Sequence, residues 1–333
     1  MAERSNSPER IGQILGGIDK LPMLPAVAVR LLEVTEDEKS SALDLAKLIE
    51  TDQALAAKTM RMANSAYYGR SGKISTLRDA VALVGFGALR STILTVFFMD
   101  VFKGTANDTG FDTEAFWLHS LACAICGREI GRKLRGSASF AEEAFVCGML
   151  HDTGKVLLNN YLPGDYKKVV DAVATQNLTI AEAEQAILEV DHAQVGSELL
   201  RLWKLPEHET RAIHLHHQPP AEKAGQDPGS RLAEVVRLAD TIVRMQKIGS
   251  GGDDIPRFVE PKALASLGLT KEEVSELAAE LDDKVWEAAQ TMGIKKDEKK
   301  SYFDLLTESN RERVLMRSLS LSEGKYRLLF DSF

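Results

Sequence analysis

The stretch that decides the fold of this chain is Val146-Cys-Gly-Met-Leu-His-Asp-Thr-Gly-Lys155. Its adjacent pair His151 and Asp152 combines imidazole with carboxylate, a ligand mixture that suits Fe, Mn, Ni or Zn better than Mg or Ca. The partners that such a metal site needs recur on segments far apart in the sequence. They are His119, His192, His216, His217 and Asp240. Separate helices can bring residues of this kind together in the core of a bundle.

The segments that carry these residues have apolar side chains at helical spacing. The long helical patterns cover about 112–134 and 139–159, and shorter ones follow at 164–176, 180–189, 192–203 and 207–217. Asp52 is the predicted N-cap of a helix over 53–63, and Thr76, Thr179 and Thr270 each begin a capping-box pattern. No segment alternates with period two between hairpin turns. The sequence therefore predicts an all-α fold, a multi-helix bundle with an N-terminal helical subdomain.

Two connectors divide the chain into predicted parts. A polar segment over 103–110 precedes the histidine-bearing region, and a glycine-rich loop over 249–254 follows it. The parts are an N-terminal helical block (10–103), the metal-site bundle (111–248), a helical extension of the bundle (255–293) and a tail (300–333). The extension has an amphipathic stripe over 272–292. The tail has helical spacing but no chemical motif, so a packing helix, a coiled-coil connector and a partner-binding segment are all compatible with it.

The composition is that of a soluble globular protein, since 44% of the 333 residues are hydrophobic and 27% are charged. A formal net charge of −8 disfavours a generic nucleic-acid-binding surface. The longest apolar run, Ile93–Met99, is too short to span a bilayer, and the first residues lack the apolar core of a signal peptide. We therefore expect a cytoplasmic protein without membrane insertion.

The cysteines Cys123, Cys126 and Cys147 fit a reducing compartment and form no disulfide framework. The first two have C-x-x-C spacing, which is typical of a redox motif or of half a zinc site. They lie in an apolar helical run, without a second cysteine pair or a preceding strand. We interpret the thiols as core residues, because free cysteine packs as a small hydrophobe.

Five of the seven histidines fall in the order H, HD, H, HH, followed by a D. A lone histidine is usually a core or surface residue, but a complete series is harder to explain in that way. Asp152 could bridge two ions, and two ions about 3.5–4 Å apart form a clamp for phosphoester cleavage. Lys155 follows on the same helical edge and either contacts a phosphate or faces solvent. We predict one or two divalent Fe, Mn, Ni or Zn ions held by His119, His151, Asp152, His192, His216, His217 and Asp240.

The His-Asp series resembles that of the HD phosphohydrolase superfamily, and other motifs resemble its HDOD (HD-related output domain) family. These motifs are Leu21–Ala28, Asp52–Leu55, Arg61–Gly69, Ile74–Val81, Leu202–Pro206 and Ile213–Pro219. The resemblance covers roughly residues 10–290. It implies an all-helical, HD-domain-like module of bacterial signalling, which acts as a regulatory output domain without established catalytic activity.

The chain differs in two places from the related HD-GYP cyclic di-GMP phosphodiesterases. Gln218-Pro219 follows the double histidine, where those enzymes have Gly-Tyr-Pro. Ala115 stands four residues before His119, where they need a carboxylate, and Glu114 would project about 100° away. The resemblance thus favours a regulatory module that binds a signalling protein or, as a small ligand, a cyclic nucleotide. A homodimer is compatible with this class.

Two alternatives stay open beside the regulatory module. In the first, the chain is a metal-dependent phosphohydrolase or cyclic-nucleotide phosphodiesterase, in which Asp152 and Lys155 take part in catalysis. In the second, a bound metal stabilises the bundle without any chemistry, because it binds the folded state alone.

Overall fold

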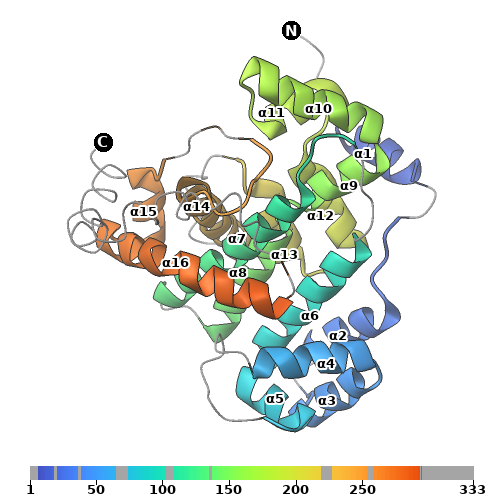
Figure 1. Cartoon of the computed structure of the whole chain (residues 1–333), viewed down its shortest axis with the longest axis vertical. Coiled ribbons are helices and arrows are strands. Elements are labelled where there is room, and N and C mark those ends of the chain that lie inside the picture. Colours follow the sequence, from blue (N-terminus) through green and yellow to red (C-terminus); the bar gives the residue numbers. More distant parts are fainter. Residues whose placement is uncertain are drawn as a thin grey trace, which may run out of the picture.

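The structure is a computed structural model that describes residues 7–18, 21–36, 39–64, 74–102, 108–134, 137–218, 227–253, 255, 258–292 and 294. Within these ranges every regular element is an α-helix, so the predicted all-α class is confirmed. A large bundle and a smaller helical block at one end make up the molecule (Figure 1). Three features of the sequence lie outside the described residues: the predicted tail 300–333, most of the motif Arg61–Gly69, and residues 103–107 of the first connector.

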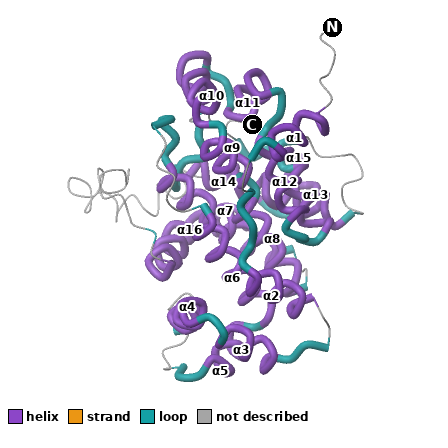
Figure 2. Tube along the Cα trace, turned by 90° about the vertical axis from the view of Figure 1, so that its right-hand side faces the viewer, coloured by secondary structure: helices purple, strands orange, loops and turns teal. Residues whose placement is uncertain are grey.

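The smaller block contains α2 (Ala26–Glu36), α3 (Ala42–Glu50), α4 (Gln53–Ala63), α5 (Leu77–Val84) and α6 (Phe86–Val101). Asp52 caps α4 as predicted, since its Oδ1 accepts a hydrogen bond from the Leu55 N–H at 3.0 Å. Gly85, at φ 84°, connects α5 to α6 with a bend of 108°. Helix α6 packs on α2 and also on α8 of the bundle, and so joins the two parts of the molecule (Figure 2).

The bundle is built from α7 (Thr113–Lys133), α8 (Ala138–Leu150), α9 (Thr153–Tyr161), α12 (His192–Leu202), α13 (Glu207–Leu215) and α14 (Pro228–Gln246). Helix α7 lies against α8 and α14, while α12 lies against α9 and α13. The contact between α7 and α8 requires a glycine, because a Cβ on Gly148 would lie 2.5 Å from the carbonyl oxygen of Cys123. The backbones of α7 and α8 therefore approach each other closely at Cys123 and Gly148.

The predicted single helix over 139–159 is wrong, because α8 ends at Leu150 and α9 begins at Thr153. Asp152, between them, has φ −99° and ψ 11°, outside the α-helical region. A tertiary contact accounts for the break: a Cβ on Gly154 would lie 2.1 Å from the carbonyl oxygen of His192. The start of α9 is thus pressed against the start of α12, and the junction places His151 and Asp152 in the centre of the bundle.

The remaining helices surround the bundle. They are α1 (Ser7–Gly16), α10 (Pro163–Gln176), α11 (Ile180–Leu188), α15 (Pro261–Leu267) and α16 (Lys271–Met292). Helix α16 crosses α7, and its predicted apolar stripe is buried, which confirms the amphipathic assignment (Figure 1). Helix α1 packs on α12, and Arg10 Nε of α1 donates to the carbonyl of Leu188, the last residue of α11, at 3.1 Å. Among the described residues, no single helix is long and apolar enough to cross a membrane, and α5 and α6 reach that length only as a bent pair.

Candidate metal centre

The structure brings together all seven residues of the predicted ligand series, from five separate places in the bundle. His119 lies within α7 and Asp240 within α14, whereas His192 begins α12. The others lie at the ends of helices: the His151–Asp152 pair between α8 and α9, and the double histidine directly after α13. Together with Cys123, they form two groups, in each of which the ligand atoms lie within 4.8 Å of one another. The first group is His119, Cys123, His151 and Asp240, and the second is Asp152, His192, His216 and His217.

Asp152 lies between the two groups and faces both. Its Oδ2 is 3.3 Å from His151 Nε2 and 3.8 Å from His119 Nε2. Its Oδ1 is 3.1 Å from His192 Nε2 and 3.7 Å from His216 Nε2. Each carboxylate oxygen of Asp152 therefore faces a different group of imidazoles, as a bridging carboxylate would, and the bridging of two ions stays a prediction.

The Nε2 atoms of His151 and His216 show whether the residues of the centre fit a metal ion. The Nδ1 atoms of His151 and His216 lie 2.8 and 2.6 Å from the carbonyl oxygens of Gly148 and Ile213. A carbonyl only accepts, so each Nδ1 carries the proton and each Nε2 presents a lone pair to the centre. Both Nε2 atoms are buried and have no hydrogen-bond partner among the described residues. Because unpaired buried acceptors cost free energy, this donor set fits a divalent metal ion.

Glu184 orients His192 from behind. One carboxylate oxygen accepts from the His192 backbone N–H at 2.8 Å and lies 2.5 Å from Nδ1, and the other accepts from the Tyr166 hydroxyl at 3.0 Å. Burial alone would lower the pKa of His192, but the Glu184 and Asp152 carboxylates outweigh it and raise the pKa to about 9. Burial lowers the pKa of His216 to about 4. A carboxylate behind a ligating histidine fixes its tautomer and strengthens it as a ligand.

Each aspartate of the centre is paired with a cation, Asp152 with the buried Lys155 and Asp240 with the partly buried Arg244. Lys155 Nζ lies 2.6 Å from Asp152 Oδ2 and also donates to the Gly251 carbonyl at 2.7 Å. The solvent-facing alternative for Lys155 is therefore wrong, because its side chain is fully buried. Arg244 Nε donates to Asp240 Oδ1 at 2.8 Å. Although burial opposes ionisation, Arg244 and His119 hold the pKa of Asp240 well below its usual range.

The glycine-rich segment after α14 covers one side of the centre. Its Ser250 N–H donates to the Ala115 carbonyl at 3.0 Å. A Cβ on Gly249 would lie 2.4 Å from the backbone nitrogen of His119. Asp253, also in this segment, accepts from Arg244 at 3.1 Å. Glu114 is exposed, so it supplies no carboxylate here. The glycine-rich segment therefore packs directly against the turn of α7 that contains Ala115 and His119.

Sequence reasoning missed four residues of the centre. Cys123 and Arg244 each stand four places after a predicted ligand, a spacing that puts both members of a pair on one helix face. Glu184 and Asp253 give no local signal, because their partners are distant in sequence or belong to another element. The other two histidines lie apart from both groups: His208 is 3.6 Å from Glu143 and His214 is 3.4 Å from Ser197.

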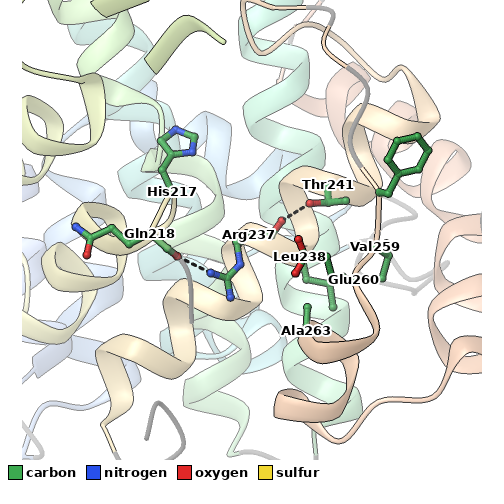
Figure 3. A pocket seen from close by; sticks show the side chains of 9 residues that line it. His217, Gln218, Arg237, Leu238, Thr241, Val259, Glu260 and Ala263 are labelled. Atoms are coloured by element: carbon green, nitrogen blue, oxygen red, sulfur yellow. Dashed lines mark hydrogen bonds between the residues drawn. The ribbon is translucent and has the colours of Figure 1, made fainter. Parts of the chain in front are cut away.

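A surface pocket of about 270 Å³ lies beside the second group (Figure 3). His217 is only partly exposed and lines the pocket, while its Nε2 lies 2.7 Å from His192 Nε2. Arg237 also lines the pocket and donates to the Gln218 carbonyl at 2.5 Å (Figure 3). The pocket is thus separated from Asp152 by the pair of histidines.

Solved structures share this arrangement of helices. An HDOD domain protein of unknown function from Geobacter sulfurreducens is 25% identical, with a TM-score of 0.74 over 85% of this chain and 97% of that one. A protein from Shewanella amazonensis SB2B, provisionally named a phosphohydrolase, is 26% identical, with a TM-score of 0.65 over 84% of this chain and 97% of that one.

Sequence comparison agrees with the structural comparison. An uncharacterised protein of Treponema pallidum (strain Nichols) is 24% identical over 274 residues, which are 82% of this chain and 51% of the relative, so the chain spans about half the length of that protein. The HDOD domain matches residues 21–219, from α2 past the double histidine. Asp240 and the glycine-rich cover lie beyond this match. Because the matched region is more than half of the chain, the protein belongs to the HDOD domain family.

Proposed function

We propose that this protein is a cytoplasmic bacterial signal-transduction module that holds a divalent metal ion and acts by binding a protein partner or a small ligand. The observation that carries the proposal is the closure of the centre. His119, His151, Asp152, His192, His216 and Asp240 are all buried, and both aspartates are ion-paired. A substrate phosphate would have to displace Lys155 or the glycine-rich cover to reach Asp152, whereas a regulatory centre needs no such opening.

The contact between the N-terminal block and the bundle supports a regulatory role. Arg90 of α6 makes a two-point ion pair with Glu209 of α13, with distances of 2.8 and 3.0 Å. Glu209 is buried, and α13 leads directly to the double histidine. A change in the metal centre that moves the end of α13 would therefore reach α6 through a rigid element and a buried charge pair.

The metal would be held by the two groups of ligands that share Asp152. When bound, a divalent ion in such a site supplies Lewis-acid chemistry and cross-links the helices that ligate it. The protein's own residues set the conditions around it. Glu184 orients His192, while Lys155 and Arg244 balance the charge of the two aspartates.

A metal-dependent phosphohydrolase is the second candidate function. Two adjoining ligand groups with a shared aspartate suit a two-ion clamp, and the pocket beside His217 offers a route for a ligand. The relative from Shewanella amazonensis carries a phosphohydrolase name. In that case Lys155 would leave Asp152 and contact a substrate phosphate.

Metal analysis combined with a hydrolysis assay tests the proposal. Untagged wild-type protein should contain near-stoichiometric Fe, Mn, Ni or Zn, and the double variant His151→Ala/Asp152→Ala should lose it. With Mn or Fe added, neither protein should hydrolyse cyclic dinucleotides or a model phosphodiester. Turnover by the wild type that is lost in His151→Ala would instead establish the hydrolase, and a folded wild-type protein that binds no metal would refute the metal centre.

A further inference from the structure

Cys123 lies in the first ligand group, although its sequence context predicts a core thiol. It is one helical turn after His119 on α7, and its Sγ is 3.5 Å from His119 Nε2. It shares the group with His151 and Asp240, and all four residues are buried. Cys126 and Cys147 are equally buried but belong to neither group in the described part of the chain. Burial alone thus does not explain the position of Cys123.

Among the described residues, neither neutral tautomer of His119 finds hydrogen-bond partners for both ring nitrogens. Its Nε2 lies 3.0 Å from Asp240 Oδ1, a contact that requires a proton on Nε2. With that proton, Nε2 cannot accept a hydrogen bond from the Cys123 thiol. With the proton on Nδ1 instead, Nε2 faces the carboxylate as a lone pair, and Nδ1 is buried without a partner among the described residues. Either tautomer leaves one contact of the ring unfavourable.

A metal ion would bind the His119 Nε2 lone pair, the Cys123 sulfur and the Asp240 carboxylate oxygen at once, and would so account for the close approach of these three atoms. Zinc–sulfur and zinc–nitrogen bonds of about 2.3 and 2.0 Å at a tetrahedral angle give a sulfur–nitrogen separation of about 3.5 Å. The separation of Cys123 Sγ and His119 Nε2 is 3.5 Å. The thiol is therefore at the distance from the imidazole that a shared zinc ion requires.

We propose that Cys123 is a metal ligand, and that His119, Cys123, His151 and Asp240 form a thiolate-containing site for a thiophilic ion such as Zn(II) or Fe(II). The inference rests on the proposed metal-binding function and goes beyond it. The second group offers only imidazole nitrogen and carboxylate oxygen. The first group therefore has the softer ligand set, because it includes a thiolate sulfur. The thiolate half favours Zn(II) over Mn(II), whereas the other half discriminates less between them.

Cobalt substitution tests the ligand directly. Metal-free protein reloaded with Co(II) should show the intense near-ultraviolet band of thiolate-to-cobalt charge transfer. The band should vanish in Cys123→Ser and persist in Cys126→Ser, a matched control whose thiol is buried on the same helix. Cys123→Ser should also lose at least about 10-fold in zinc affinity and less in manganese affinity. X-ray absorption of the zinc-loaded wild type should show a sulfur neighbour at about 2.3 Å, and this needs no variant to fold.

The outcomes separate this inference from the proposed function. Cobalt bound without the band, a band that survives Cys123→Ser, or a zinc environment without sulfur would overturn the thiolate ligand and leave the metal-binding module standing. A wild type that binds no metal would overturn both. The band together with hydrolysis of a phosphodiester would support Cys123 as a ligand and refute the purely regulatory function.

Discussion

The N-terminal block and the bundle hold their helices together by different means. In the described part of the block, residues 26–36, 39–64 and 74–102, the fully buried polar side chains are hydroxyls. Thr92 and Thr95, for example, each donate to the carbonyl four residues earlier, at 2.9 Å. The bundle instead buries imidazoles, carboxylates, Lys155 and Arg128. An apolar core tolerates substitutions of similar volume, whereas a buried polar network depends on every partner being present. The bundle should therefore be the more fragile part.

The largest effect is expected at the junction of α9 and α12. Gly154→Ala would place a Cβ 2.1 Å from the His192 carbonyl oxygen, so the two helices must separate and the metal ligands with them. We expect a loss of more than about 4 kcal/mol in the free energy of unfolding, beyond the ordinary range for a point substitution. Urea unfolding and metal content measure it.

Gly164→Ala is the matched control, because a Cβ there meets nothing within 4 Å. It should stabilise α10 by about 0.5–1 kcal/mol, since alanine favours a helix over glycine. A Gly154→Ala protein with wild-type stability and metal content would show that the junction is not constrained by this contact.

The second effect concerns the boundary between the two regions. Arg90→Ala removes the partner of Glu209, whose side chain is 1% exposed, while that of Arg90 is 11% exposed. An uncompensated buried carboxylate should cost about 3 kcal/mol in the free energy of unfolding. Urea unfolding measures this loss and the loss in the control variant Lys58→Ala. Lys58→Ala, which breaks the exposed Lys58–Asp100 pair within the N-terminal side, should cost less than about 1 kcal/mol. Equal losses in the two variants would contradict a special role for the boundary pair.

The third effect concerns Glu184, which orients the ligand His192 but does not itself belong to either ligand group. Glu184→Gln removes the carboxylate behind His192, and we expect metal affinity to fall about 10–100-fold. Glu182→Gln on the same helix is the control, because glutamine can keep the capping box with Thr179. Titration with zinc in competition with a chelator measures both variants. The idea fails if the two variants bind zinc equally well.

The sequence predicted the parts of this molecule that depend on local spacing and on residue type. The boxes at Thr179 and Thr270 form as expected. The box at Thr76 is half formed, since its Oγ1 accepts from the Asp79 N–H at 3.1 Å and donates to the Asp79 carboxylate at 2.6 Å. The order of histidines and aspartates identified residues that the fold does bring together, because chemical type alone marks them.

The rest depends on contacts between segments distant in sequence. Apolar spacing continues from α8 into α9, so only the approach of Gly154 to His192 reveals the break. The pairing of Lys155 with Gly251 joins residues 96 positions apart, and no local pattern can report it. Cys123 is different, because its spacing from His119 was visible, but its apolar neighbours favoured a core thiol. Its position beside His119, His151 and Asp240 in the fold is what supports the proposed ligand role.

The most gradual effect is the pH dependence of the metal-free protein between about pH 4 and pH 9, to which two buried histidines of the bundle contribute. The pKa of His216 is lowered to about 4, so the unfolded chain takes up a proton first, and stability falls as the pH drops from about 6.5 towards 4. The pKa of His192 is raised to about 9, so its contribution is complete below about 6.5 and is lost as the pH rises through 9. Stability should therefore be greatest near neutral pH, with slopes of about 1 kcal/mol per pH unit on either side.

Urea unfolding in the presence of a chelator, at intervals between these two pKa values, measures the profile. His119 and His217, whose pKa values burial also lowers, steepen the acid side. His192→Gln should flatten the alkaline side and leave the acid side in place, because Glu184 then has no imidazolium to stabilise. An alkaline slope that persists in His192→Gln would place the titrating group elsewhere. The comparison between the two regions would then lose its simplest electrostatic explanation.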